Sequence, residues 1–293
     1  MNFKYHLAAV FTTVVWGTTF VASKSILESG LTPMQTMFFR FIIGYAFTCA
    51  LCPRKFGFNS WRDELMFAGV GLFGGSMYFM FEYTALLYTK AANVGFICSL
   101  VPLQVALIDI FMFRQKFRAG FLIAGSAMAL VGVALVVFNG RFAVTLSLIG
   151  DTLALAASLC WAIYSFFLHR LGTRFEPLYV TRKLFFYSLI SLLPFMLHAN
   201  QLAIPQSLFN LNVCVPLLYL SLVASLVCLW LWNVSINGLG TTIPNNYLYM
   251  LPIITLITSH IILGEEMTTY VILGGLLIIS GVWCADKSVV AKR

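Results

Sequence analysis

Charged side chains are scarce in this chain. Only 10% of its 293 residues are Asp, Glu, Lys or Arg, whereas 60% are apolar. A soluble domain carries about a quarter charged residues. So few charges cannot cover a surface that faces water, which excludes a soluble protein, whereas a lipid bilayer accepts exposed hydrocarbon. We therefore expect a multi-pass protein of the cell (inner) membrane, surrounded by lipid.

The sequence also lacks the motifs of several catalytic and binding classes. Its seven cysteines are spread over the apolar runs, and none stands with histidine or carboxylate at zinc spacing. No Walker motif is present, and the basic residues do not gather on a polar face that would bind nucleic acid. We expect no catalytic residues, no metal, no cofactor and no nucleic-acid partner, and hence no enzyme.

What the sequence has in abundance is apolar runs of about 20 residues, the length that crosses about 30 Å of hydrocarbon as a helix. We count ten, at approximately residues 7–27, 34–52, 65–87, 92–113, 119–138, 148–168, 178–198, 213–236, 242–263 and 268–286. The sequence thus predicts an all-α integral membrane protein with ten transmembrane helices.

The basic residues predict the orientation of these helices. With the amino terminus inside, 14 of the 18 basic residues fall in inner segments. Only Lys24, Arg40, Lys90 and Arg141 fall outside. The positive-inside rule then places both termini in the cytoplasm.

The chain also repeats itself at a distance of about 150 residues. Pro102 coincides with Pro252 at an offset of 150, and Trp16 coincides with Trp161 at an offset of 145. Five spans is an odd number, so the second copy starts on the opposite side of the membrane and the repeats are inverted. We expect one five-helix repeat in residues 1–145 and the other in residues 146–293.

Several segments resemble a known family. They are WGTTFVASKSIL from Trp16, ALLYTKAANVGFICSLVPL from Ala85 and LGEEMTTYVILGGLLIISGVW from Leu263. Together they resemble the drug/metabolite transporter superfamily, in the branch with two EamA repeats, over essentially the whole chain. The resemblance implies a central cavity lined by spans one, three, four, six, eight and nine, with spans five and ten peripheral. It also implies the export of amino acids or other small metabolites, which some relatives import instead.

Helical periodicity predicts which face of the third span is directed towards the centre of the protein. Gly71, Gly75, Tyr78 and Glu82 recur at i, i+4, i+7 and i+11 and so share one stripe. Trp232 belongs to the corresponding stripe of the eighth span. Small residues let membrane helices approach closely, and polar residues on the same face avoid lipid. We therefore expect both stripes to face the centre of the protein.

Glu82 is the sharpest functional candidate. A carboxylate deep in an apolar run is costly and usually faces a partner or a water-filled cavity. It either binds a cationic group of the substrate or carries a coupling proton. The alternative is a structural pair with Lys90, Lys24 or Arg40, which are all expected on its side of the membrane.

Aromatic and amide side chains add further candidates. An aromatic wall can stack on a planar or cationic ligand, although aromatics in membranes are mostly packing residues or interfacial anchors. Amides near helix ends can bind a carboxylate, although capping is their ordinary role. The candidate substrate-binding residues are Trp16, Thr19, Tyr78, Glu82, Gln104, Trp161, Tyr164, Trp232, Asn245 and Tyr249.

These features favour a secondary active transporter. We expect it to export a small polar metabolite, most readily an amino acid or a related compound, by alternating access, with protons as candidate coupling ions and Pro102 and Pro252 as hinges. An importer or exchanger of a nucleoside-like or cationic metabolite is one alternative. An intramembrane lipid-modifying enzyme is another, and a non-transporting scaffold is a third. The protein is expected to be a monomer or a homodimer.

Overall fold

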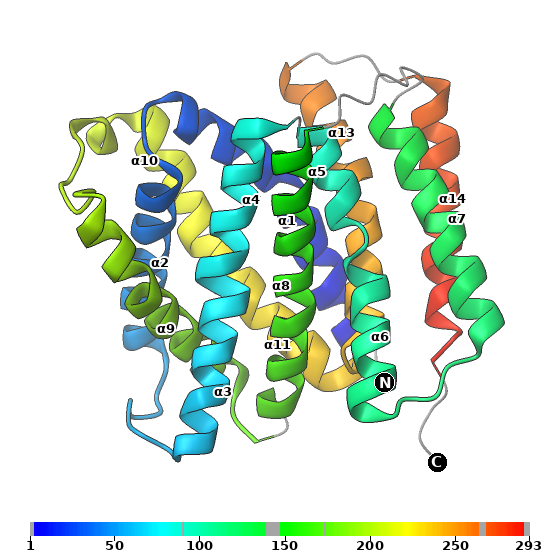
Figure 1. The fold of residues 1–293 in the computed structure, drawn as a ribbon, viewed down its shortest axis with the longest axis horizontal. Coiled ribbons are helices and arrows are strands. Elements are labelled where there is room, and N and C mark those ends of the chain that lie inside the picture. Colours follow the sequence, from blue (N-terminus) through cyan, green and yellow to red (C-terminus); the bar gives the residue numbers. More distant parts are fainter. Residues whose placement is uncertain (1–2, 90, 139–146, 173, 264–267, 290–293) are drawn as a thin grey trace.

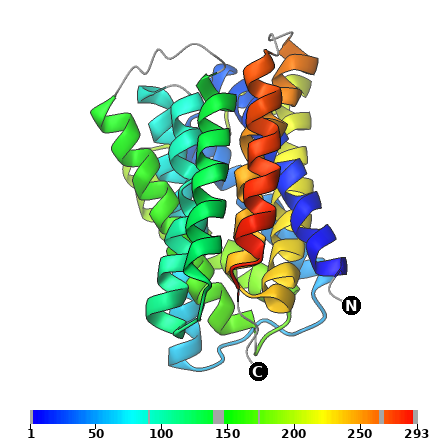
Figure 2. The same cartoon turned by 90° about the vertical axis from the view of Figure 1, so that its right-hand side faces the viewer.

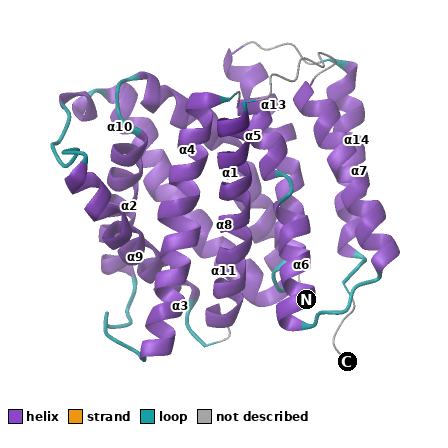
Figure 3. Ribbon diagram, viewed as in Figure 1, coloured by secondary structure: helices purple, strands orange, loops and turns teal. Residues whose placement is uncertain are grey.

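The computed structural model describes residues 3–89, 91–138, 147–172, 174–263 and 268–289. Several residues used above lie outside this set, namely Lys90, Arg141 and the Glu265-Glu266 pair, and the side chain of Lys24 is also not described. The described residues form helices joined by loops and contain no β-strand (Figure 3). The prediction of an all-α fold is confirmed.

The helices form one bundle (Figure 1). In the first half they are α1 (Phe3–Glu28), α2 (Pro33–Leu51), α3 (Trp61–Gly71), η1 (Leu72–Ser76), α4 (Met77–Tyr88), α5 (Ala91–Cys98), α6 (Val101–Phe113) and α7 (Ala119–Phe138). In the second half they are α8 (Leu148–Gly172), α9 (Pro177–His198), η2 (Gln206–Phe209), α10 (Leu211–Leu218), η3 (Tyr219–Val227), α11 (Cys228–Leu239), α12 (Thr242–Asn246), η4 (Tyr247–Met250), α13 (Leu251–Leu263) and α14 (Thr269–Asp286).

These elements account for the predicted membrane spans. Eight helical segments of the described chain are long and apolar enough to cross a bilayer. The other two expected spans coincide with α1 and with the α12–η4–α13 segment. Large apolar side chains such as Leu148, Phe111 and Trp283 are exposed on the outside of the bundle. This distribution suits a surface that meets hydrocarbon rather than water.

Local sequence signals explain where the helices begin. Thr32 caps α2 through a capping box with Gln35, and Pro33 occupies the first turn. Ser60 caps α3 by accepting a hydrogen bond from the backbone N–H of Asp63. Short connectors with such caps set the spans side by side.

Spans three and eight each contain a π-helical segment at a corresponding place. In span three this is η1, and in span eight it is η3. Glycine allows close packing at η1, because a Cβ atom on Gly74 would collide with Tyr164 and one on Gly75 would collide with Ser188. A π-segment adds a residue to a turn and so rotates the side chains that follow it.

Spans four and nine are each interrupted before a proline. Helix α5 ends at Cys98 and α6 begins at Val101, directly before Pro102. The short 3₁₀ segment η4 precedes α13, which carries Pro252 in its first turn. Proline has no N–H group and cannot complete the preceding turn. The repeated prolines therefore mark repeated helix breaks.

Helices α7 and α14 form a pair at one edge of the bundle (Figures 1 and 2). They cross where Gly125 lies against Gly281 and Gly132 lies against Gly274, and a side chain at any of these positions would meet the opposite backbone. Spans five and ten are therefore peripheral, as the family resemblance implied.

Helix α1 begins and α14 ends on the same side of the bundle (Figure 1). The connectors from α2 to α3 and from α6 to α7 lie on that side too, and they carry Arg54, Lys55, Arg114, Lys116 and Arg118. This gathering of positive charge agrees with the expected orientation. The cytoplasmic position of both termini stays a prediction.

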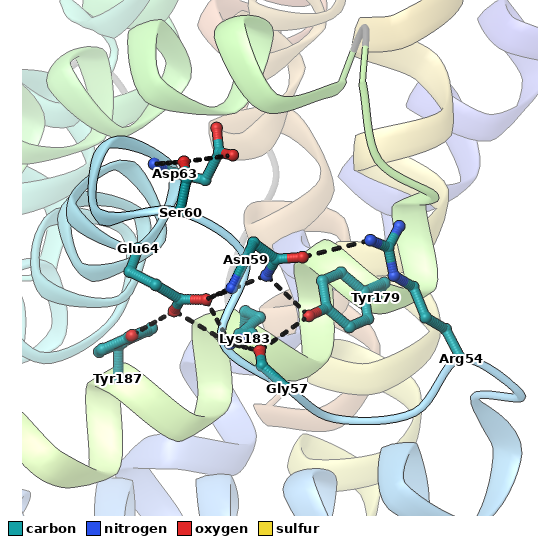
Figure 4. Close-up of polar contacts among 9 residues, drawn as sticks. All are labelled: Arg54, Gly57, Asn59, Ser60, Asp63, Glu64, Tyr179, Lys183 and Tyr187. Atoms are coloured by element: carbon teal, nitrogen blue, oxygen red, sulfur yellow. Dashed lines mark hydrogen bonds and ion pairs between the residues drawn. The ribbon is translucent and has the colours of Figure 1, made fainter.

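A polar network on that side joins the two halves of the chain (Figure 4). Lys183 donates to both oxygens of Glu64 at 2.9 Å, and the backbone N–H and side-chain amide of Asn59 donate to Glu64 Oε1 at 3.0 and 2.9 Å. The Tyr187 hydroxyl donates to Glu64 Oε2. We call this the clamp network; its members are Arg54, Gly57, Asn59, Glu64, Tyr179, Lys183 and Tyr187, and Ser60 and Asp63 form a separate pair beside it.

Candidate functional site

A cavity lies among the central helices. The cavity is narrow, with a volume of about 60 Å³, and it is partly open to the outside. The lining comes from spans one, two, three, four, six, eight and nine. The lining residues are Trp16, Thr19, Arg40, Tyr78, Phe79, Glu82, Cys98, Val101, Trp161, Ala224, Leu229, Leu248 and Leu251.

Aromatic rings from both halves form one wall of this cavity. The ring centroid of Trp161 lies 5.2 Å from that of Trp16 and 5.1 Å from that of Tyr78. Trp232 packs behind Trp16 at 5.0 Å, and Tyr164 packs behind Trp161 at 5.0 Å. Trp232 and Tyr164 are fully buried and support the wall rather than line it.

Hydrogen bonds fix the two tryptophans at the front of this wall. Trp16 Nε1 donates to the carbonyl oxygen of Ala224 in η3 at 2.8 Å. Trp161 Nε1 donates to Asn245 Oδ1 at 3.1 Å. With the indole N–H groups occupied, the rings have a single orientation and present their faces and edges to the cavity.

Glu82 extends from α4 into the cavity and is 6% exposed. Tyr78, one helical turn away, and Arg40 lie near its carboxyl group and line the same cavity. Arg40 is thus the cation that the described residues place near Glu82. No ion pair within 4 Å joins their side chains in the described chain.

Arg40 was not expected in the cavity. Counting basic residues places it in an outer segment, yet it lies within α2 and is 4% exposed. Its Nε donates to Ser225 Oγ at 2.5 Å, its Nη1 donates to the Tyr83 hydroxyl at 3.2 Å, and its Cζ lies 4.6 Å from the centre of the Phe79 ring. The sequence does carry a signal for this position, because a charge inside an apolar run is the same signal that identified Glu82.

The structure brings together some of the other candidates and separates the rest. Thr19 lines the cavity beside Trp16, and its hydroxyl donates to the Trp16 carbonyl oxygen at 2.7 Å. Gln104 donates to Ser158 Oγ at 3.0 Å and does not line the cavity. Tyr249 is buried in the cluster that holds α7 and α14, away from the cavity.

A buried carboxylate on α6 also bridges the halves. Asp109 Oδ2 in α6 accepts a hydrogen bond from the Thr241 hydroxyl and a second from the Thr242 hydroxyl at 2.6 Å, both at the start of α12. Asp109 Oδ1 has no partner among the described residues. Asn245, which holds Trp161, donates to the Thr241 carbonyl oxygen at 2.8 Å. Hydrogen bonds therefore connect the cavity wall to the contact between α6 and α12.

The chain matches a known protein family over most of its length. The profile of the EamA-like transporter family matches residues 3–138 and again residues 148–285. The chain belongs to this family. Membership in the EamA-like transporter family, with the names of its relatives, identifies the chain as a multi-pass membrane transporter and not an enzyme.

Relatives of this EamA-like chain cover nearly its full length. An "Uncharacterized transporter" of Archaeoglobus fulgidus is 27% identical over 97% of each chain. A "Probable amino-acid metabolite efflux pump" of Salmonella typhimurium is 26% identical over 97% of this chain and 95% of its own. A "Probable terminal-alkyne amino-acid exporter" of Streptantibioticus cattleyicolor is 25% identical over 98% and 94%.

A solved crystal structure shares the fold of this EamA-like chain. Its TM-score is 0.74 at 18% sequence identity, and the match covers 96% of both chains. At this identity the match supports the arrangement of helices and nothing about the ligand.

Proposed function

We propose that this EamA-like protein is a secondary active transporter that exports an amino acid or a related small polar metabolite. The observation that carries the proposal is the central cavity, which combines a wall of aromatic rings with two buried charges. Sites of this composition bind small molecules that have both apolar and charged parts. The names of the Salmonella and Streptantibioticus relatives support the same substrate class.

Alternating access in this proposal comes from motion between two repeats, residues 1–145 and 146–293. The helix breaks before Pro102 and Pro252 are the hinges, since a broken helix bends at lower cost than a continuous one. The contact of Asp109 with Thr241 and Thr242 closes the side where α6 ends. It must separate when that side opens.

The hinge assignment has its own test. Replacing Pro102 by alanine restores a backbone N–H and should straighten the junction between α5 and α6. We expect Pro102→Ala to change the turnover rate several-fold while the KM stays close to that of the wild type. Unchanged turnover would remove Pro102 from the mechanism.

Transport itself is testable with purified protein in liposomes. Efflux, uptake and counterflow of radiolabelled amino acids measure both the activity and its direction. We expect Trp161→Ala to abolish most of the transport because it removes the front of the cavity wall, and we expect Trp283→Ala to preserve it because Trp283 faces outward and is 64% exposed. Movement of nucleosides or cations, with none of amino acids, would favour the alternative substrate classes.

A further inference from the structure

The hydrogen bonds of Arg40 leave part of its guanidinium group free. Every contact that holds it is to a neutral group: the hydroxyls of Ser225 and Tyr83 and the ring of Phe79. A guanidinium has five N–H donors, and the described residues provide no acceptor for those on Nη2. A buried charge without a close counter-ion is costly in a membrane protein. The fork of Arg40 is therefore suited to a carboxylate that comes from outside the chain.

The Glu82 carboxylate also has few hydrogen-bond partners within the protein. An ionised carboxylate accepts about four hydrogen bonds, whereas the described residues give Glu82 no ion pair, and the polar side chains near it in the cavity are Tyr78 and Arg40. Trp16, Trp161 and Tyr78 surround the same space with aromatic rings. Ring faces next to a carboxylate form a favourable environment for an ammonium group.

The two charges line the same cavity without pairing with each other. Arg40 and Glu82 line one cavity, and their charged atoms are more than 4 Å apart, because they do not form an ion pair. The carboxylate and ammonium groups of an α-amino acid are attached to one carbon atom, so a single small molecule can contact both residues. The lining also includes the apolar side chains of Val101, Leu229 and Leu251.

We infer that Arg40 and Glu82 together recognise a zwitterion, with Arg40 binding the carboxylate and Glu82 binding the ammonium group, while the apolar lining receives an uncharged side chain. This inference rests on the proposed transport function and narrows it to neutral α-amino acids. Glu82 then serves as a ligand for the substrate, which is one of the two roles that the sequence left open for it.

Three related compounds test the contributions of the two substrate charges separately. Leucine carries both, leucinamide lacks the carboxylate, and 4-methylpentanoate lacks the ammonium group. Counterflow of labelled leucine in proteoliposomes measures how well each unlabelled compound competes. For the wild type we expect leucine to compete at least about 10-fold better than either analogue, because each charge-assisted contact contributes about one factor of ten or more.

The variants should change this preference in opposite ways. Arg40→Gln should reduce the affinity for leucine to about that for leucinamide and leave leucinamide unaffected. Glu82→Gln should reduce the affinity for leucine to about that for 4-methylpentanoate and leave that compound unaffected. Arg182→Gln is the matched control, because it removes another buried arginine that lies on α9 outside the cavity, and it should keep the wild-type preference.

The possible failures are distinguishable. If Arg40→Gln does not fold, Arg40→Lys keeps the charge without the planar fork, and it should weaken leucine binding without changing that of leucinamide. Equal loss of all three compounds in folded variants, or unchanged preferences, would show that Arg40 and Glu82 are only structural and overturn the inference. If the wild-type protein moved no amino acid at all, the proposed function itself would fail, whatever the variants do.

Discussion

Two buried carboxylates on the same span differ in how completely the protein satisfies them. Glu64, in the clamp network, receives hydrogen bonds from Lys183, Tyr187 and two N–H groups of Asn59 (Figure 4). Glu82, 18 residues later on the same span, lies near the Tyr78 hydroxyl and has an arginine beyond ion-pair distance. Full satisfaction indicates a structural role, and incomplete satisfaction indicates a place for a ligand.

Asp109 lies between these two extremes. One of its oxygens accepts hydrogen bonds from Thr241 and Thr242, and the other has no partner among the described residues. Its contact joins α6 to α12 and must break if the two halves move apart. A partly satisfied group suits such a contact, since a fully bonded one would hold the conformation too strongly.

The clamp network should produce the largest loss of stability. Glu64→Gln leaves the buried ammonium group of Lys183 without its counter-charge, and breaking one side of such a pair costs about 3–5 kcal/mol. We expect a much lower melting temperature for the purified protein in detergent. The double variant Glu64→Gln, Lys183→Met should lose less than the sum of the two single variants. A melting temperature equal to that of the wild type would show that Glu64 does not stabilise the fold.

Asp109 should have an intermediate effect. Asp109→Asn keeps the shape of the side chain and one acceptor oxygen but weakens the hydrogen bonds from the two threonine hydroxyls, at a cost of about 1 kcal/mol. We expect a modestly lower melting temperature together with a changed turnover rate, because the proposed mechanism requires this contact to break when one side opens. Thr152→Val is a suitable control, as it removes a hydroxyl that only bonds within its own helix. Loss of stability as large as that of Glu64→Gln would mean that Asp109 is a structural anchor.

The smallest loss of stability should come from Glu82. Glu82→Gln removes a charge that the protein itself satisfies little, and we expect the free energy of unfolding without substrate to change by less than about 1 kcal/mol. Melting curves recorded beside those of Glu64→Gln measure the difference. Equal destabilisation by the two substitutions would contradict the claim that Glu64 stabilises the fold much more than Glu82 does.

The sequence predicted the helices and part of the cavity because both depend on local signals. Apolar runs identify spans directly, and a carboxylate within such a run identified Glu82. Arg40 carried the same signal, but counting positive charges treats every cation as part of a connector. The pairing of Glu64 with Lys183 joins residues 119 positions apart, and nothing in either segment alone reveals it.

Regular helical periodicity explains why some candidates lie elsewhere. The stripe of Gly71, Gly75, Tyr78 and Glu82 crosses η1, where the π-turn rotates the chain, so that the glycines face α9 while Tyr78 and Glu82 face the cavity. Tyr249 lies in the 3₁₀ segment η4, whose tighter turn carries it towards α7 and α14. A constant period of 3.6 residues cannot anticipate either irregularity.

The most direct test is substrate-induced thermal stabilisation of the wild type, Glu64→Gln and Glu82→Gln. A ligand at about 100 times its Kd adds about 2.7 kcal/mol to the free energy of unfolding. With leucine we expect a clear upward shift of the melting temperature for the wild type, the same shift from a lower starting point for Glu64→Gln, and little or no shift for Glu82→Gln. A full shift in Glu82→Gln, or its loss in a folded Glu64→Gln protein, would contradict the assignment of Glu82 to the substrate and Glu64 to the fold.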